Sequence, residues 1–344
     1  MDISLLCCAN IKLHFILPLF FSDVKPLIDF ILCERYNKRK EQIKSGKYHL
    51  PTGGIYMEKE MRVAAIHDLS GAGKCALTIV LPVMSALGCE VSVLPTAILS
   101  THTGGFTNPV VRDLTADMLP MAEHWKREGA CFEAVYSGFL GSAEQIGIVR
   151  EVFRMNRETN PGVKILVDPV MGDHGKLYKT YTKEMADGMA ELCEAADIIV
   201  PNFTEAYHLL GETYREGPYE KKEIERILRG LAAMGPETVV LTGVYFNEEE
   251  IGAACYDKKT DAVDFVLHPR VPGSYHGTGD LFASVLLGAL MQGLSTHDAC
   301  GCAVSAVADA IAYTVKSGRK DTRWGVKFEK ILPNLMKNVF SLAK

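Results

Sequence analysis

The strict alternation of two hydrophobic patterns constrains this chain most. From residue 62 onward, short runs rich in Val, Ile and Leu alternate with longer segments whose apolar residues recur at helical spacing. Strands are predicted at 62–67, 90–95, 133–136, 163–168, 197–200 and 237–241, and helices at 75–87, 115–128, 142–157, 183–194, 203–210 and 219–234. Strands separated by helices form right-handed βαβ units. The pattern therefore predicts a doubly wound α/β fold, with a mostly parallel sheet and helices on both faces.

The pattern changes after residue 250. Two apolar runs at 251–256 and 262–267, joined by a polar turn, predict an antiparallel hairpin at the edge of the sheet. Two further helices are predicted at 279–292 and 296–316.

The first sixty residues do not share this alternation. Residues 34–60 are polar and contain Pro51, Gly53 and Gly54, which is typical of a linker. We therefore predict one α/β domain over 57–344, preceded by an extension over 1–56 that is poorly ordered or not part of the native product. The alternative is an amphipathic arm that binds a membrane or a partner.

The apolar part of this extension, residues 4–33, does not predict a transmembrane helix. Charged residues such as Lys12, Asp23 and Asp29 interrupt it, so no uncharged run of about 18 residues is long enough to cross a bilayer. A basic start and a small-residue cleavage site, which mark a secretory signal, are also missing from this pattern. No membrane association is expected.

Charge and cysteine content narrow the class of partner. Lys and Arg number 37 and Asp and Glu 42, a net charge of −5, and no basic stripe indicates nucleic-acid binding. The 10 cysteines include no C-x₂-C pair, which argues against structural zinc and against a secreted disulfide framework. A small-molecule partner and a cytoplasmic protein with reduced thiols are expected.

The most informative motif is the turn Gly277-Thr278-Gly279, which runs directly into an apolar helix. Backbone N–H groups at a helix N-terminus form an anion site that the helix dipole strengthens. Asp280 follows the turn, where a carboxylate is placed to accept the proton of a substrate hydroxyl during phosphoryl transfer. The alternative is an ordinary first-turn acid that only favours the helix dipole.

Acidic residues also follow other predicted strands. Asp168 and Asp173 come after one strand, and Asn202 and Glu205 come after the next. Ligands bind at the carboxyl ends of strands in such sheets, and these oxygen ligands suit Mg²⁺. Asn and Glu three residues apart also form an ordinary helix capping box, which is the alternative here.

The glycine-rich turn after the first strand is not a P-loop. Asp68 stands where that motif requires Gly, and Cys75 stands where it requires Ser or Thr. Asp68 at the strand end is expected to face the crevice at the carboxyl edge, or else to cap the following helix. Lys176, in another glycine-rich loop, would reach ATP phosphates if that loop closes as a lid.

Three segments together resemble a known family. DPVMGD at 168–173, PNFTEA at 201–206 and GTGDLFA at 277–283 resemble the small-molecule kinases of the ribokinase superfamily, and among them the vitamin B6 kinases. The resemblance covers about residues 61–315. It implies a ribokinase-like fold, ATP and Mg²⁺ as cofactors with a monovalent cation left open, and a homodimer. It also implies phosphorylation of the 5′-hydroxymethyl group of pyridoxal, pyridoxamine or pyridoxine.

The resemblance also implies roles for individual residues. Asp280 matches the catalytic base, and Gly277, Thr278 and Gly279 match the anion hole. The positions that match the Mg-ATP region are Asp168, Asp173, Asn202, Glu205 and Thr242, with Asp168 and Glu205 on the metal side.

On the substrate side, the resemblance rests on fewer residues. His102 and Thr103 match the His-Thr-Gly segment that holds the polar edge of the pyridine ring, and Phe139 occupies a position that is often Tyr. Asp68 occupies a position that is often Ser, and an acid there would favour the cationic amine of pyridoxamine.

Two alternatives stay open at this point. A hydroxymethylpyrimidine or hydroxymethylpyrimidine-phosphate kinase shares the architecture and the GTGD-type turn, but the His102-Thr103-Gly104 segment argues against it. A catalytically silent protein that senses vitamin B6 or ATP is the other alternative. The intact GTGD sequence argues against that one.

Overall fold

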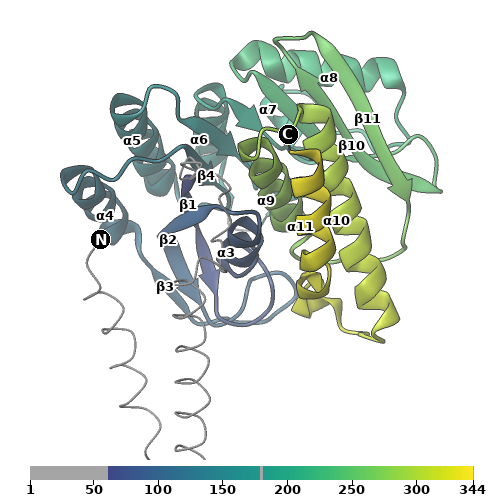
Figure 1. Ribbon diagram of the computed structural model, residues 1–344, viewed down its shortest axis with the longest axis horizontal. Coiled ribbons are helices and arrows are strands. Elements are labelled where there is room, and N and C mark those ends of the chain that lie inside the picture. The colour runs from purple at the N-terminus through teal and green to yellow at the C-terminus, as the bar shows by residue number, and fades with distance from the viewer. Residues whose placement is uncertain (1–60, 179–180, 344) are drawn as a thin grey trace, which may run out of the picture. The chain divides into compact units, whose positions relative to one another are not determined.

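The computed structural model describes residues 61–178 and 181–343, so the extension predicted over 1–56 lies outside the described residues. A nine-stranded sheet in the order β11-β10-β9-β8-β5-β4-β1-β2-β3 forms its centre (Figure 1). Its strands are β1 (Arg62–Ser70), β2 (Glu90–Leu99), β3 (Val111–Asp113), β4 (Ala134–Ser137), β5 (Lys164–Val167), β8 (Ile198–Ile199), β9 (Thr238–Val244), β10 (Glu250–Asp257) and β11 (Ala262–Pro269). A separate two-stranded sheet pairs β6 (Gly172–Asp173) with β7 (Lys176–Leu177).

The six central strands are parallel, and the outer pairings are antiparallel. Parallel ladders join β9, β8, β5, β4, β1 and β2. The β10–β11 hairpin adds to β9 in antiparallel fashion, and β3 adds to β2 at the other edge. The predicted doubly wound sheet with an antiparallel edge hairpin is therefore confirmed. The short strands β3, β6 and β7 were not predicted, because none of them lies in a run of apolar residues, as the equally short β8 does.

Helices cover both faces of the sheet. The α-helices are α3 (Leu77–Ala86), α4 (Thr115–Arg127), α5 (Ala143–Thr159), α6 (Lys183–Glu194), α7 (Phe203–Leu209), α8 (Lys221–Met234), α9 (Thr278–Met291), α10 (Thr296–Lys316) and α11 (Leu332–Leu342), and the 3₁₀ helices are η1 (Thr322–Trp324) and η2 (Phe328–Lys330). One core contains side chains of α4 to α8, and the other contains side chains of α3, α9, α10 and α11. The C-terminal helices α9, α10 and α11 lie side by side (Figure 1).

Strand β1 shows why both faces are apolar. Val63 and Ala65 point into the core of α3 and α9, whereas Ala64 and Ile66 point into the core of α4 to α8. Successive strand residues face opposite sides, so a strand covered on both sides must be apolar throughout. The continuous run of apolar residues in the sequence follows from this double burial.

The chain order of the strands reverses beside β1. Strand β1 pairs with β2 on one side and with β4 on the other. A crevice forms at such a switch point, outside the carboxyl ends of the strands. The topology therefore places the end of β1, with Asp68, beside the end of β4, with Phe139.

Helix α10 is long and apolar enough to cross a membrane by length and composition alone. Half of its apolar window is buried inside the fold, where it packs against α9, β10 and β11. Its apolar character is accounted for by this packing. Its bounds match the predicted helix 296–316, whereas α11 was not predicted.

The close packing of α3 against α9 can be tested by substituting two glycines, one in α9 and one in α10. A Cβ added at Gly288 in α9 would overlap Leu87, whereas a Cβ added at Gly301 in α10 meets no described atom within 4 Å. Gly288→Ala should lower the free energy of unfolding by about 1–3 kcal/mol, because it overpacks the core. Gly301→Ala should raise it by up to about 1 kcal/mol, because Ala favours the helix. Urea unfolding checks both, and equal effects would contradict this packing.

Candidate active site

The turn at residues 277–279 has a backbone that only glycine adopts easily. Gly277 is in the left-handed region, with φ of 79°, and a Cβ there would overlap the carbonyl oxygen of Lys74. Helix α9 starts at Thr278, and its first intrahelical bond runs from Leu281 N–H to the Gly277 carbonyl at 3.0 Å. The first N–H groups of a helix have no intrahelical partner. This turn is therefore suited to hold an anion, as its sequence predicted.

Asp280 lies in the first turn of α9 and is half-buried. Burial raises its pKa, and a hydrogen bond from the Ala76 N–H opposes that rise, as does the neighbouring His102. Ala76 has φ of 50° and ψ of −129°, a conformation that normally needs glycine in a tight turn. The strained residue thus aims its N–H group at the carboxylate.

Four carboxyl groups, including that of Asp280, lie close enough for their charges to affect one another's pKa. Burial and the charge of Asp280 raise the pKa of Asp68 to about 6, and the same two causes raise the pKa of Asp168 well above its usual range. Burial and the charge of Asp168 in turn raise the pKa of Glu205. Buried like charges repel, and a bound cation relieves that repulsion. The structure therefore brings together three acids that the sequence placed near the ends of separate strands and a fourth, Asp280, at the start of a helix.

Glu205 and Asn202 form a complete capping box at the start of α7. The two Glu205 carboxylate oxygens accept hydrogen bonds from Asn202 N–H at 2.8 Å and from Met171 N–H at 3.1 Å. Asn202 Oδ1 accepts from Glu205 N–H at 3.0 Å, and its Nδ2 donates to the Gly172 carbonyl at 2.9 Å. The capping alternative is thus what the structure shows for this pair. Each Glu205 oxygen keeps one further acceptor position.

The predicted nucleotide-side residues gather around this capping box. Asp173 and Lys176 pair across the β6–β7 hairpin, which is tied to α7 by a hydrogen bond from Gly175 N–H to Thr204 Oγ1 at 2.9 Å. Thr242 lies at a bridge with Asn202, and its N–H donates to the Pro201 carbonyl at 2.9 Å. Asp173 and Lys176 are exposed at the edge of this group.

The predicted substrate-side residues are less closely grouped. His102 is buried and lies close enough to Asp280 to affect its pKa. Both of its ring nitrogens are already hydrogen-bonded to backbone groups, at Arg323 and Gly104. Thr103 is exposed and Phe139 is half-buried at the end of β4. In the described part of the chain, no hydrogen bond or ring contact joins either of them to Asp280.

The carboxylates of the described residues can supply only part of a ligand set for Mg²⁺. Within residues 61–178 and 181–343, no three His, Cys, Asp or Glu side chains are close enough to hold one metal ion. Mg²⁺ keeps several waters and takes one or two protein carboxylates together with phosphate oxygens. Asp168, buried and repelled by Asp280, fits such a partial ligand set.

The sequence analysis did not identify several residues that lie around the site. His276 precedes the anion turn directly, and its ring centroid lies 4.9 Å from that of His102. Arg323 and Trp324 contact the His102 loop from a segment without a recognisable motif. Two tryptophans in the whole chain make Trp324 a conspicuous residue, but rarity alone indicates no contact.

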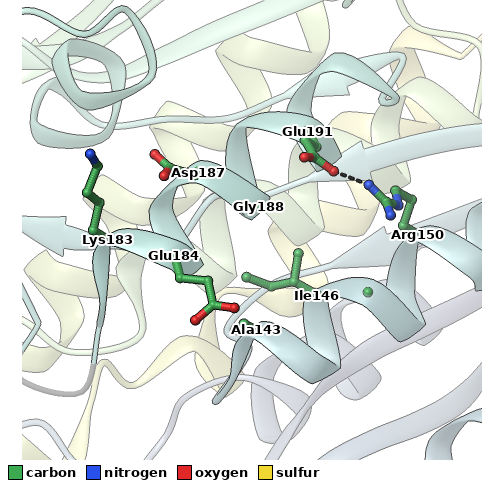
Figure 2. A pocket seen from close by; sticks show the side chains of 9 residues that line it. Ala143, Ile146, Arg150, Lys183, Glu184, Asp187, Gly188 and Glu191 are labelled. Atoms are coloured by element: carbon green, nitrogen blue, oxygen red, sulfur yellow. Dashed lines mark hydrogen bonds and ion pairs between the residues drawn. The ribbon is translucent and has the colours of Figure 1, made fainter.

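A surface cavity of about 510 Å³ lies elsewhere, between α5 and α6. Figure 2 shows Ile146 at its floor and the Arg150–Glu191 ion pair across one end. None of the predicted site residues lines it. The cavity is therefore separate from the site described above.

The fold and the site together define a class. An anion-binding helix start, a half-buried carboxylate beside it and further carboxylates at neighbouring strand ends are the parts of a small-molecule kinase with a ribokinase-like fold. Residues 70–324 match the model of the phosphomethylpyrimidine kinase family. The chain belongs to this family of the ribokinase superfamily, and the resemblance to the vitamin B6 kinases within the superfamily is confirmed.

One curated relative is a pyridoxine/pyridoxal/pyridoxamine kinase from Bordetella avium. It is 30% identical over 250 residues, which cover 68% of this chain and 78% of that protein. The chain spans between 65% and 78% of the length of the first curated relatives it matches.

Two solved structures are similar over most of the chain. An inferred phosphomethylpyrimidine kinase from Bacteroides thetaiotaomicron is 38% identical, with a TM-score of 0.77 and coverage of 82% of this chain and 96% of that one. A second crystal form of that protein contains pyridoxal. The pyridoxal kinase from Lactobacillus plantarum is 32% identical, with a TM-score of 0.74 and coverage of 81% and 98%.

The raised pKa of Asp68 predicts a pH-dependent stability difference. The folded-state pKa of about 6 exceeds the unfolded value of 3.8, so the folded protein binds more protons between these two values and loses stability as pH rises through them. Asp68→Asn should therefore match the wild type near pH 3.5 and exceed its free energy of unfolding by about 2–3 kcal/mol above pH 6.

Thermal or urea unfolding over pH 3.5 to 8 measures this difference. Asp321→Asn serves as the control, because Arg323 lowers the pKa of Asp321 to about 2 and the effect has the opposite sign. A constant difference between Asp68→Asn and the wild type at all pH values would contradict the burial of an ionisable Asp68.

Proposed function

We propose that this protein transfers the γ-phosphoryl group of Mg-ATP to the 5′-hydroxymethyl group of a vitamin B6 compound: pyridoxal, pyridoxamine or pyridoxine. The observation that carries the proposal is the half-buried Asp280 carboxylate, which lies in the same turn as the 277–279 anion site and accepts a hydrogen bond from the Ala76 N–H. The B6 kinase among the relatives and the pyridoxal-bound structure of the Bacteroides protein support the substrate class.

In this reaction Asp280 acts as the general base. It accepts the proton of the substrate hydroxyl as that oxygen forms a bond to the γ-phosphorus, and the bond from the γ-phosphorus to the bridging oxygen of ATP breaks, releasing ADP. A raised pKa suits a carboxylate to this task, because the ideal base has a pKa near the working pH. The Ala76 N–H holds the carboxylate in place.

The turn at 277–279 stabilises the charge that spreads over the transferring group. Its N–H groups are fixed before the reaction, so they need no reorganisation as charge develops. The positive end of the α9 dipole adds to this effect.

Mg-ATP is proposed to lie beside the carboxyl groups of Asp280, Asp168 and Glu205. Asp168 and Glu205 would hold Mg²⁺, which neutralises phosphate charge when bound. Asp173, Lys176, Asn202 and Thr242 are proposed to contact the nucleotide. Asp68, Thr103 and Phe139 are proposed to face the vitamin.

The runner-up function is phosphorylation of hydroxymethylpyrimidine or its phosphate. The match to the phosphomethylpyrimidine kinase family favours it, since the family includes that chemistry by description. A catalytically silent sensor is disfavoured by the intact GTGD sequence and by the hydrogen bond that the Asp280 carboxylate accepts from the Ala76 N–H. A cytoplasmic homodimer also stays a proposal, and light scattering of the purified full chain tests the dimer.

Replacing the proposed base predicts a loss of turnover without a loss of nucleotide binding. Asp280→Ala should lower kcat by about 10²- to 10⁴-fold, the usual contribution of a general base. The measurement is ADP release at saturating Mg-ATP and pyridoxal, with ATP affinity from calorimetry.

Asp298→Ala is the matched control for Asp280→Ala. Asp298 occupies the same position in the first turn of α10 that Asp280 occupies in α9, but it is exposed and bonds to the cap residue Ser295. It should change stability slightly and kcat not at all. A loss below tenfold in Asp280→Ala would leave Asp280 with only the dipole role.

The acid at position 68 predicts a preference among vitamin forms. The Asp68 carboxylate would attract the ammonium group of pyridoxamine, so wild-type kcat/KM should be higher for pyridoxamine than for pyridoxal. Asp68→Asn should reduce that ratio. Equal kcat/KM for the two forms in both proteins would contradict a contact between Asp68 and the amine.

A further inference from the structure

His102 lies where four loops of the site meet. A Cβ added at Gly73 would come within 2.6 Å of its ring, so the first glycine-rich turn packs directly on it. The ring of Phe106, on the same loop as His102, and the ring of His276, beside the anion turn, each lie 4.9 Å away by centroid distance. The fourth contact is with the turn around Arg323.

The hydrogen bonds of the His102 ring define its tautomer. Nδ1 accepts from the Gly104 N–H at 3.1 Å, so this nitrogen carries no proton. Nε2 therefore carries the proton and donates it to the Arg323 carbonyl oxygen at 2.6 Å. Neither nitrogen is left free to bond a substrate.

Side chains around Arg323 strengthen the same connection. Its guanidinium donates to the Gly105 carbonyl at 3.3 Å and lies over the Phe106 ring, 5.2 Å from the centroid. The Trp324 ring contacts Phe106 edge-on at 5.0 Å. Asp321 holds the guanidinium from behind through hydrogen bonds of 2.8 and 2.9 Å.

The segment that carries Arg323 is also attached to the catalytic side. Val326 N–H donates to the His276 carbonyl at 3.3 Å, one residue before the anion turn. Glu329 pairs with Lys74 at 2.5 Å, next to the turn that leads to Ala76. Residues 321–329, here called the C-terminal clamp, thus contact the 100–106 loop, the residue before the anion turn and the turn that leads to Ala76.

We propose that His102 is a positioning residue that fastens the 100–106 loop to the C-terminal clamp, and that it does not bond the vitamin. Arg323 is the second half of this fastening, through its backbone carbonyl and its guanidinium. The inference rests on the proposed function, because it assigns His102 a different task in the same site. Its effect on phosphoryl transfer passes through the position of the loops around Asp280.

The direct test is the tautomer of His102, read from ¹⁵N chemical shifts of the ring nitrogens in the full chain labelled with ¹⁵N-histidine. His102→Gln identifies the resonances. The expected result is a proton on Nε2 and none on Nδ1, both in the free protein and in protein saturated with pyridoxamine. A proton on Nδ1, or an exchange of tautomer when pyridoxamine is added, would overturn the proposal.

Kinetics give a second readout that a direct substrate contact would not produce. His102→Ala should lower kcat by about 10- to 100-fold with the same factor for all three vitamin forms and an unchanged KM for ATP. His102→Gln should recover most of that loss, because its amide N–H can replace Nε2–H. His124→Gln, at an exposed histidine of α4, is the control and should leave the kinetics unchanged.

Failure of this proposal differs from failure of the proposed function. A rise in the vitamin KM that differs among the three forms, with no recovery in His102→Gln, would show that His102 contacts the vitamin. Absence of turnover with every B6 form in the wild type would reject the proposed function instead. The tautomer in the free protein would still decide the role of His102.

Discussion

The burial of several carboxyl groups beside one helix start is the constraint on which this site depends. Asp68 and Asp168 are buried, and the charge of the half-buried Asp280 raises the pKa of both. Isolated buried charges are costly, so the arrangement is stable only with compensating hydrogen bonds, protons or cations. A kinase that binds a magnesium–nucleotide complex supplies such a cation during every turnover. The destabilised acids are thus consistent with function, and the Ala76 N–H stabilises the one that reacts.

The topology explains how these acids come together. Asp68 and Asp168 end the parallel strands β1 and β5, and Asp280 enters from α9, which packs on α3. Parallel strands present all their carboxyl ends at one edge, and the switch beside β1 opens that edge. The rest of the fold is largely apolar packing that holds the strand ends in register.

Much of this architecture was predictable because local hydrophobic patterns in the sequence indicate its strands and helices. The apolar runs at 62–67 and 163–168 and the 3.6-residue pattern at 296–316 are local features of the sequence, which need no tertiary information. The GTGD turn was recognisable from its glycines and from the apolar helix that follows them. The structure adds that a Cβ at Gly277 would overlap the Lys74 carbonyl oxygen. The C-terminal clamp was not predictable, since its contacts to His102 and Lys74 join positions more than 200 residues apart. For the same reason, the sequence could not show that both His102 nitrogens are occupied.

The central claim is that this protein phosphorylates a vitamin B6 compound at the group of carboxylates around Asp280. Its most direct measurement is ADP release by the purified full chain with Mg-ATP and, in separate reactions, pyridoxal, pyridoxamine, pyridoxine and hydroxymethylpyrimidine, with the product mass confirmed. The account predicts turnover with at least one B6 form and little with the pyrimidine. Turnover with the pyrimidine alone would move the activity to the runner-up, and no turnover with any of the four would contradict the account.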